Sequence, residues 1–149
     1  MARYSVLMQR TASTSLSVGG IQCPGFGQRR IKLYDWMFGS EAAPADNAFL
    51  WQVQRSTTAG TSTSVTPQPL DPADAAAVSI AGTNFTVDPT LTSGQLPLSV
   101  PLNQRASFRW VSAPGSEIVV PASANYGLAF RTPTSSAVAV TATALIDEQ

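Results

Sequence analysis

Two carboxylates, Asp35 and Glu117, are the acidic residues that the alternating pattern of the chain places within strands. Two carboxylates with separated pKa values are what a glycosidase needs, one as general acid and the other as base or nucleophile. The simpler interpretation is that each pairs with Arg109 or Arg131 or faces solvent. The remaining acidic residues fall in expected loops or at chain ends: Glu41, Asp46, Asp71, Asp74, Asp88, Asp147 and Glu148. We therefore expect Asp35 and Glu117 to be structural.

Side chains for nucleophilic and metal chemistry are scarce. The chain has no His, so it forms neither a Ser-His-Asp nor a Cys-His arrangement and lacks the common zinc-ligand sets. Loop oxygens near Asp46 and between Asp71 and Asp74 are too sparse for a calcium site. The Gly-rich stretch 19–27 lacks the strand-to-helix context of a phosphate-binding loop. We expect no enzyme activity, no cofactor and no metal.

Composition limits the class of partner. The 149 residues carry nine basic and nine acidic side chains, and no block of like charge marks a nucleic-acid binder. No run approaches the roughly 18 consecutive apolar residues of a membrane span, and the first residues hold no apolar core of signal-peptide length. We expect synthesis in a cytoplasm without a signal, and no nucleic-acid or membrane partner. The single cysteine, Cys23, is expected to be a small buried residue.

Hydrophobic periodicity indicates strands nearly everywhere. Apolar and polar residues alternate in short segments, which eleven Pro and ten Gly interrupt at turns. Short connections favour antiparallel pairing, because a parallel crossover takes a dozen or more residues. The sequence predicts an all-β, single-domain antiparallel β-sandwich, jelly-roll-like. Residues 1–30 are expected to form an N-terminal arm or the first strands, and residues 31–149 the sandwich.

Three segments carry specific strand predictions. Alternation in 31–38 places the odd-numbered residues on one face and the even-numbered residues on the other, and both faces carry large side chains. Two prolines mark 96–102 as an edge strand or an extended arm, since proline cannot donate to a ladder. The hydroxyl-rich run 56–66 favours extended structure, because threonine suits strands.

Two further segments differ from the strands above: one is predicted to be a helix, and the other allows two interpretations. Asp71 as a cap and Pro72 at the first helical position predict one short helix near 71–77. The run 135–146 consists of small and β-branched residues. It is either a central strand under bulky neighbours or a strand at an interface with another chain.

Two constellations combine an aromatic residue with Arg and amide side chains, one from Trp51 to Thr57 and the other from Asn103 to Trp110. The simpler interpretation is two neighbouring core strands anchored by the tryptophans, each of which would cost about 3–5 kcal/mol to truncate. The functional interpretation adds an oligomer or other protein contact, because Arg and aromatic residues are enriched at interfaces. A sugar-binding platform is a further alternative.

The runs Trp51–Thr66 and Gln104–Trp110, the link Pro69–Pro72 and the turn Pro114–Glu117 resemble small virion proteins of tailed bacteriophages, in particular head decoration, or cement, proteins. The resemblance covers about residues 31–131 and includes no catalytic motif. It implies a compact β-sandwich that forms a homo-oligomer, typically a trimer, on the capsid surface of the virion. There it would stabilise the shell by bridging subunits of the phage major capsid protein.

The resemblance also implies a contact surface for the capsid or for other copies of the chain. The expected arm, or alternatively a first strand pair with a loop, is one candidate, and the two aromatic constellations supply others. The candidate contact residues are Arg3, Arg10, Arg29, Arg30, Arg55 and Arg105. The alternative function is a receptor- or glycan-binding module of a phage head fibre or tail.

Overall fold

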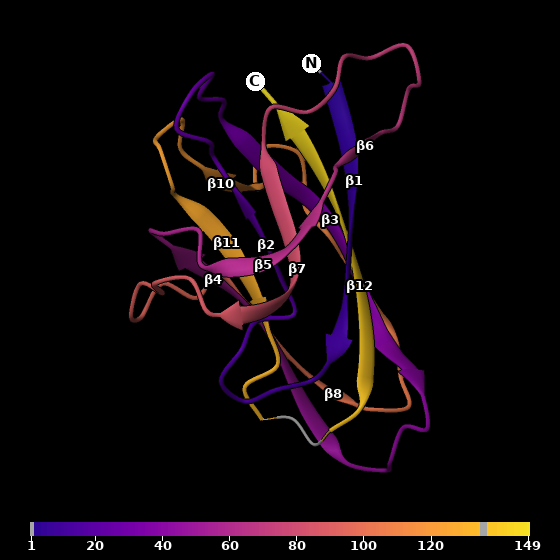
Figure 1. The fold of residues 1–149 in the computed structure, drawn as a ribbon. Helices are drawn as coiled ribbons and strands as arrows, with labels where there is room; N and C mark the ends of the chain where they lie inside the picture. Colours follow the sequence, from indigo (N-terminus) through magenta and orange to yellow (C-terminus); the bar gives the residue numbers. More distant parts are fainter. Residues whose placement is uncertain (1, 135–136) are drawn as a thin grey trace.

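The computed structural model describes residues 2–134 and 137–149, and these residues form strands and their connections (Figure 1). In chain order the strands are β1 (Ala2–Thr11), β2 (Gly19–Gln22), β3 (Ile31–Ala42), β4 (Ala48–Ser56), β5 (Thr61–Val65), β6 (Gln68–Pro69), β7 (Ile80–Val87), β8 (Leu98–Asn103), β9 (Phe108–Val111), β10 (Ile118–Val120), β11 (Gly127–Arg131) and β12 (Ala139–Glu148).

The strands form two packed antiparallel sheets. The first sheet has the order β10-β3-β12-β1-β6, with β9 also paired to β3, and the second has the order β5-β7-β2-β11-β4-β8. The prediction of an all-β antiparallel sandwich is confirmed. The expected edge strand after Pro97 is β8, which pairs with β4 alone, and the hydroxyl-rich run contributes β5 at the opposite edge.

The core lies between the sheets and is dominated by aromatic rings. Trp36 and Phe38 of β3 meet Trp51 of β4 and Phe130 of β11, with ring centroids between 4.0 and 5.8 Å apart. All four side chains are buried. Tilted and edge-on ring pairs at these distances add about 0.5–1.5 kcal/mol each to the free energy of burial. The cluster therefore ties the first sheet to the second.

The residues of β3 that point into the core change from odd-numbered to even-numbered positions along the strand. Ile31 and Leu33 are buried at its start, whereas Trp36 and Phe38 are buried farther along. The predicted alternation over 31–38 is therefore wrong beyond the first four residues. The core-facing set changes from odd-numbered to even-numbered positions.

The register between β3 and β12 shows the cause of this exchange. Leu33 lies opposite Ile146, but the next pair joins Asp35 to Leu145, so Tyr34 is an extra residue in β3. One unpaired residue is a β-bulge, and it moves every later side chain to the other face of the sheet. Asp35 therefore leaves the face that Leu33 occupies.

Strand β12 is the central strand of the first sheet, between β3 and β1. Its core-facing residues are small where β3 is large, since Ala144 lies opposite Trp36 and Ala142 opposite Phe38. Small side chains leave the space that the rings fill at close packing. Of the two interpretations of 135–146, the structure shows the central strand, and residues 135 and 136 lie outside the described residues.

The short helix predicted near 71–77 is wrong. Asp71 does act as a cap, because its Oδ1 accepts the Ala73 amide at 2.9 Å. Its carbonyl accepts the Asp74 amide at 3.0 Å, and one turn closes there without propagating. So short a helix is marginal without tertiary support, because its nucleus is costly.

A buried carboxylate fixes the chain in an extended path after this turn. Glu148 accepts the amides of Val78 at 3.1 Å and Ser79 at 2.7 Å. The Tyr4 hydroxyl donates to the Ala75 carbonyl at 3.0 Å. These bonds use backbone groups that a continuing helix would need for its own ladder.

Strand β1 is an inner strand and not a detachable arm. It pairs with β12 on one side and with β6 on the other, and Tyr4, Val6 and Met8 are buried. Strand β2 is an inner strand of the second sheet. Of the two alternatives for residues 1–30, the structure shows strands at 2–11 and 19–22.

The two sheets differ in how their outer faces are covered. Strands β5 and β8 lie at opposite edges of the second sheet, so the connections from β4 to β5 and from β7 to β8 cross its outer face. Outward-pointing Gln22, Gln54 and Ser56 are buried beneath them. In the first sheet, every connection among the described residues either moves to the other sheet or stays at the edge beside β3. One sheet face therefore stays open.

The structure separates the two tryptophans that the sequence treats as equivalent. Trp51 is buried in β4, whereas Trp110 lies partly buried in β9 of the other sheet, so the two strands are not neighbours. Trp51→Ala should lower the free energy of unfolding by about 3–5 kcal/mol, and Trp110→Ala by clearly less. Urea unfolding of the two variants measures this difference, and equal losses would contradict the placement of Trp110.

Candidate interaction surfaces

The outer face of the first sheet, which we call the open face, carries outward-pointing side chains of β1, β12, β3 and β9 in rows across the strands. One row runs through Leu7, Thr143, Met37 and Arg109, and the next runs through Ser5, Leu145, Asp35 and Val111. Leu7, Met37 and Val111 are 46%, 36% and 57% exposed. These apolar side chains lie on one face, with polar residues such as Thr143 between them, and such a face can take part in an interaction surface.

An ion pair lies on the open face between β3 and the edge strand β9. Arg109 donates from Nε to Oδ1 of Asp35 at 3.0 Å and from Nη2 to Oδ2 at 2.5 Å. Asp35 is buried beneath this fork, and the hydrogen bonds to it raise the pKa of Arg109. The Arg109 side chain remains 59% exposed. The expected pairing of Asp35 with Arg109 is confirmed, and it holds a cation in a fixed orientation.

Two hollows border the open face. The first has a volume of about 440 Å³ and is lined by Met37, Phe38, Ser107, Phe108, Arg109, Thr141 and Thr143. The second has a volume of about 250 Å³ and is lined by Arg3, Tyr34, Val111, Ser112, Pro114, Glu117 and Asp147. The second hollow brings together three charged residues from separate segments of the chain, namely Arg3, Glu117 and Asp147.

Asp147 is the most constrained group of the second hollow. It is 8% exposed, and its Oδ1 has no hydrogen-bond partner among the described residues. Burial raises its pKa, while the charges of Lys32 and Arg3 on the neighbouring strands partly offset this. Arg3 itself lies over the ring of Tyr34, 5.5 Å from the centroid.

Glu117, the second carboxylate that the sequence singled out, lies in this hollow and apart from the Asp35–Arg109 pair. Its Oε1 accepts the amide of Gly115 at 3.1 Å, and backbone hydrogen bonds lower its pKa. The structure therefore does not unite Asp35 and Glu117 in one site.

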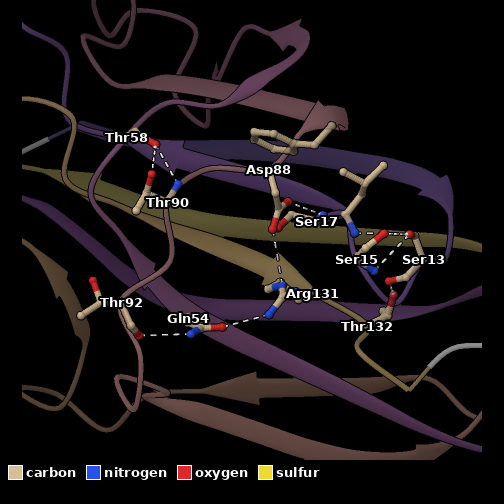
Figure 2. Close-up of polar contacts among 12 residues, drawn as sticks. Ser13, Ser15, Ser17, Gln54, Thr58, Asp88, Thr90, Thr92, Arg131 and Thr132 are labelled. Atoms are coloured by element: carbon tan, nitrogen blue, oxygen red, sulfur yellow. Dashed lines mark hydrogen bonds and ion pairs between the residues drawn. The ribbon is translucent and has the colours of Figure 1, made fainter.

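A third polar cluster lies beneath the covered face of the second sheet (Figure 2). Asp88 accepts the Ser17 amide at 2.6 Å and pairs with Arg131 at 3.7 Å. Arg131 donates to Gln54 at 3.0 Å, and Gln54 donates to the Thr92 carbonyl at 3.1 Å. The chain of bonds fastens the connection from β7 to β8 onto the sheet, so these charged groups have a structural role.

The six candidate arginines do not share one surface. Arg10 donates to the carbonyls of Thr11, Ser17 and Phe85, and burial lowers its pKa. Arg55 donates to the Val119 carbonyl. Both therefore hold backbone segments together.

Arg3, Arg29 and Arg30 lie at the end of the sandwich that holds the chain termini. Arg3 is opposite Asp147, the charge of Arg29 acts on the Tyr4 hydroxyl, and the backbone of Arg30 pairs with Gln149. Arg105 is exposed in the turn between β8 and β9, near the opposite end.

Sequence reasoning missed the open face because the bulge at Tyr34 determines which residues point outward. It also missed Phe26, which lies in the loop between β2 and β3 and is 94% exposed. The signal for Phe26 was present, since glycines on both sides of an aromatic residue give it no neighbouring side chain to pack against. Cys23, by contrast, is buried as expected.

No model of a known protein family, no curated protein and no solved structure matches the chain. Within the part of the chain that the structure describes, no helix is long and apolar enough to cross a membrane. Residues 2–134 and 137–149 also hold no group of three or more His, Cys, Asp or Glu that could bind a metal ion.

The raised pKa of Asp147 makes stability depend on pH. The native state holds this proton more tightly than the unfolded chain, so the contribution is complete below the ordinary value of 3.8 and is lost as the pH rises through the raised pKa. Asp147→Asn should therefore raise the free energy of unfolding at pH 7 and leave it nearly unchanged at pH 3. Urea unfolding at both pH values measures this. Asp74→Asn, at a less buried carboxylate, is the matched control, and equal effects of Asp147→Asn at both pH values would contradict the mechanism.

Proposed function

We propose that this chain is a structural, non-enzymatic virion protein of a tailed phage, a head decoration protein that binds the outside of the capsid as a homo-oligomer. The observation that carries the proposal is the open face. A sandwich that covers one sheet with its own connections and leaves apolar side chains exposed on the other suits binding to another polypeptide. The resemblance of residues 31–131 to decoration proteins supplies the class.

The open face suits contact between copies of the chain. It combines apolar Leu7 and Met37 with charge of both signs, because Arg109 is exposed and Glu41 accepts hydrogen bonds from Gln9 and Thr141 at its border. A surface that carries apolar groups and both signs can complement a second copy of itself. Association would also remove Leu7 and Met37 from water, worth roughly 25 cal/mol per Å² of apolar surface.

The function follows from mass action. Copies that bind the assembled shell and not its free subunits stabilise the assembled form, by an amount that grows with the free concentration of the decoration protein. Such a protein needs rigidity and a fixed contact geometry, which the aromatic core and the Asp35–Arg109 pair supply. It needs no group that changes protonation during a reaction.

The test uses shells assembled from the major capsid protein encoded in the same genome. The purified chain should sediment with expanded shells to a saturating ratio and should raise their melting temperature. The capsid melting curve with and without the protein measures this. A chain that neither sediments with these shells nor shifts their melting would overturn the proposed function.

The contact between copies has its own test. Leu7→Glu combined with Met37→Glu places two like charges on the open face and should reduce the solution mass to that of a monomer, as light scattering measures. Both side chains point away from the core, so the fold should survive. Ile80→Glu combined with Val87→Glu, at two exposed apolar positions of β7, is the matched control and should leave the mass unchanged. A chain that is already a monomer, or a mass insensitive to the open-face pair, would remove this surface from the proposal.

A further inference from the structure

Residues 23–30, which we call the tip loop, connect β2 to β3 at the end of the sandwich that carries both termini (Figure 1). Gly25 to Arg30 are all exposed, and Phe26 is 94% exposed. Burying such a side chain fully is worth roughly 1.5–3 kcal/mol. Because Phe26 is exposed, this free energy is not gained on folding and is available on binding a partner.

The tip loop is held firmly at its base. The Cys23 amide donates to the Tyr126 carbonyl at 2.9 Å, and the Cys23 carbonyl accepts the Asn125 amide at 3.0 Å. At the other end the backbones of Arg30 and Gln149 exchange two hydrogen bonds of 2.9 and 3.2 Å. Buried Cys23 closes the loop against the core. Phe26 is therefore presented on a fixed base, which reduces the entropy lost on binding.

Glycine places Phe26 at the apex. Gly27 has a φ of +64°, the left-handed conformation that turns the chain back toward β3. A side chain at Gly25 would meet nothing within 4 Å, so the apex stands clear of the domain. The ring has no neighbour that would shield it from a partner.

The tip loop also carries positive charge, and further apolar surface lies next to its base. Arg29 and Arg30 are exposed, and neither guanidinium forms an ion pair with the described residues. A hollow of about 430 Å³ lies next to the loop, lined by Arg30, Val119, Pro121 and Ala122. An exposed aromatic side chain with arginines beside it is the composition of an interface hot spot.

We propose that the tip loop is the docking element of this protein. Phe26 inserts into an apolar socket of a partner polypeptide whose rim carries carboxylates that pair with Arg29 and Arg30. Charge complementarity favours an acidic protein surface over a second copy of the chain, whose own tip would present the same two cations. The partner's identity as the phage shell protein rests on the proposed function, whereas the surface and its chemistry rest on the loop.

The test measures binding of single-site variants to the same expanded shells. Phe26→Ala should bind about ten to a hundred times more weakly than the unchanged chain, the range expected for an interface anchor. Because the Phe26 side chain is almost fully exposed, the Phe26→Ala variant should have the same melting temperature as the unchanged chain. The control variant is Val87→Ala, at an exposed apolar residue at the end of β7 that lies away from the tip loop. It should bind the shells as the unchanged chain does. Arg29→Gln with Arg30→Gln should slow association and weaken its dependence on salt.

The outcomes separate this inference from the proposed function. Shell binding by the unchanged chain and equal binding by Phe26→Ala would overturn the inference and leave the function standing. If the unchanged chain does not bind the shells, the proposed function is overturned. The shell protein is then also excluded as the partner of the tip loop. Binding to anionic phospholipid vesicles that Phe26→Ala abolishes would overturn the inference in favour of a membrane. A change in solution mass on Phe26→Ala would overturn it in favour of a second copy.

Discussion

The structure depends on one extra residue, Tyr34, in the longest strand of the first sheet. Because the side-chain period of a strand is two, this bulge turns Trp36 and Phe38 into the core and moves Asp35 to the open face. Without it, a carboxylate would face the rings and two large aromatic side chains would face solvent. The aromatic cluster between the sheets and the Asp35–Arg109 pair outside them are consequences of the same local irregularity.

The order of the strands explains why the two sheet faces differ. In the second sheet the chain twice leaves a strand next to one edge for the opposite edge, from β4 to β5 and from β7 to β8, and both crossings pass over the outer face. Buried Gln54 and partly buried Arg131 fasten the connection from β7 to β8 there (Figure 2). The first sheet receives its strands from the other sheet or from its own edge, so no connection among the described residues crosses over Leu7 and Met37. Topology alone therefore leaves one face available to another molecule.

The sequence predicted the architecture well because alternation and turn residues are local signals. Proline placement indicated an edge strand or an arm at β8, and threonine content indicated extended structure at β5. The pairing of Asp35 with Arg109 was one of the alternatives that the sequence left open. The bulge could not be predicted, because inserting one residue depends on the register with β12, which is distant in the chain. The helix near 71–77 failed for a similar reason, since Glu148 binds the backbone amides of Val78 and Ser79. The candidate arginines belong to the expected arm and to the two aromatic constellations, but Arg10 and Arg55 donate to backbone carbonyl groups instead of facing a partner.

The two exposed apolar surfaces make different physical demands, which argues for different partners. The open face spans four strands and is of mixed charge, so it gains from many weak contacts over a matching surface. The tip loop offers one aromatic ring on a base fixed by backbone hydrogen bonds, so its binding energy is concentrated in a single side chain. A broad surface suits a permanent association between copies, and a concentrated anchor suits a socket that forms only in an assembled partner. The proposed function, binding to an assembled shell and not to its free subunits, would use both surfaces.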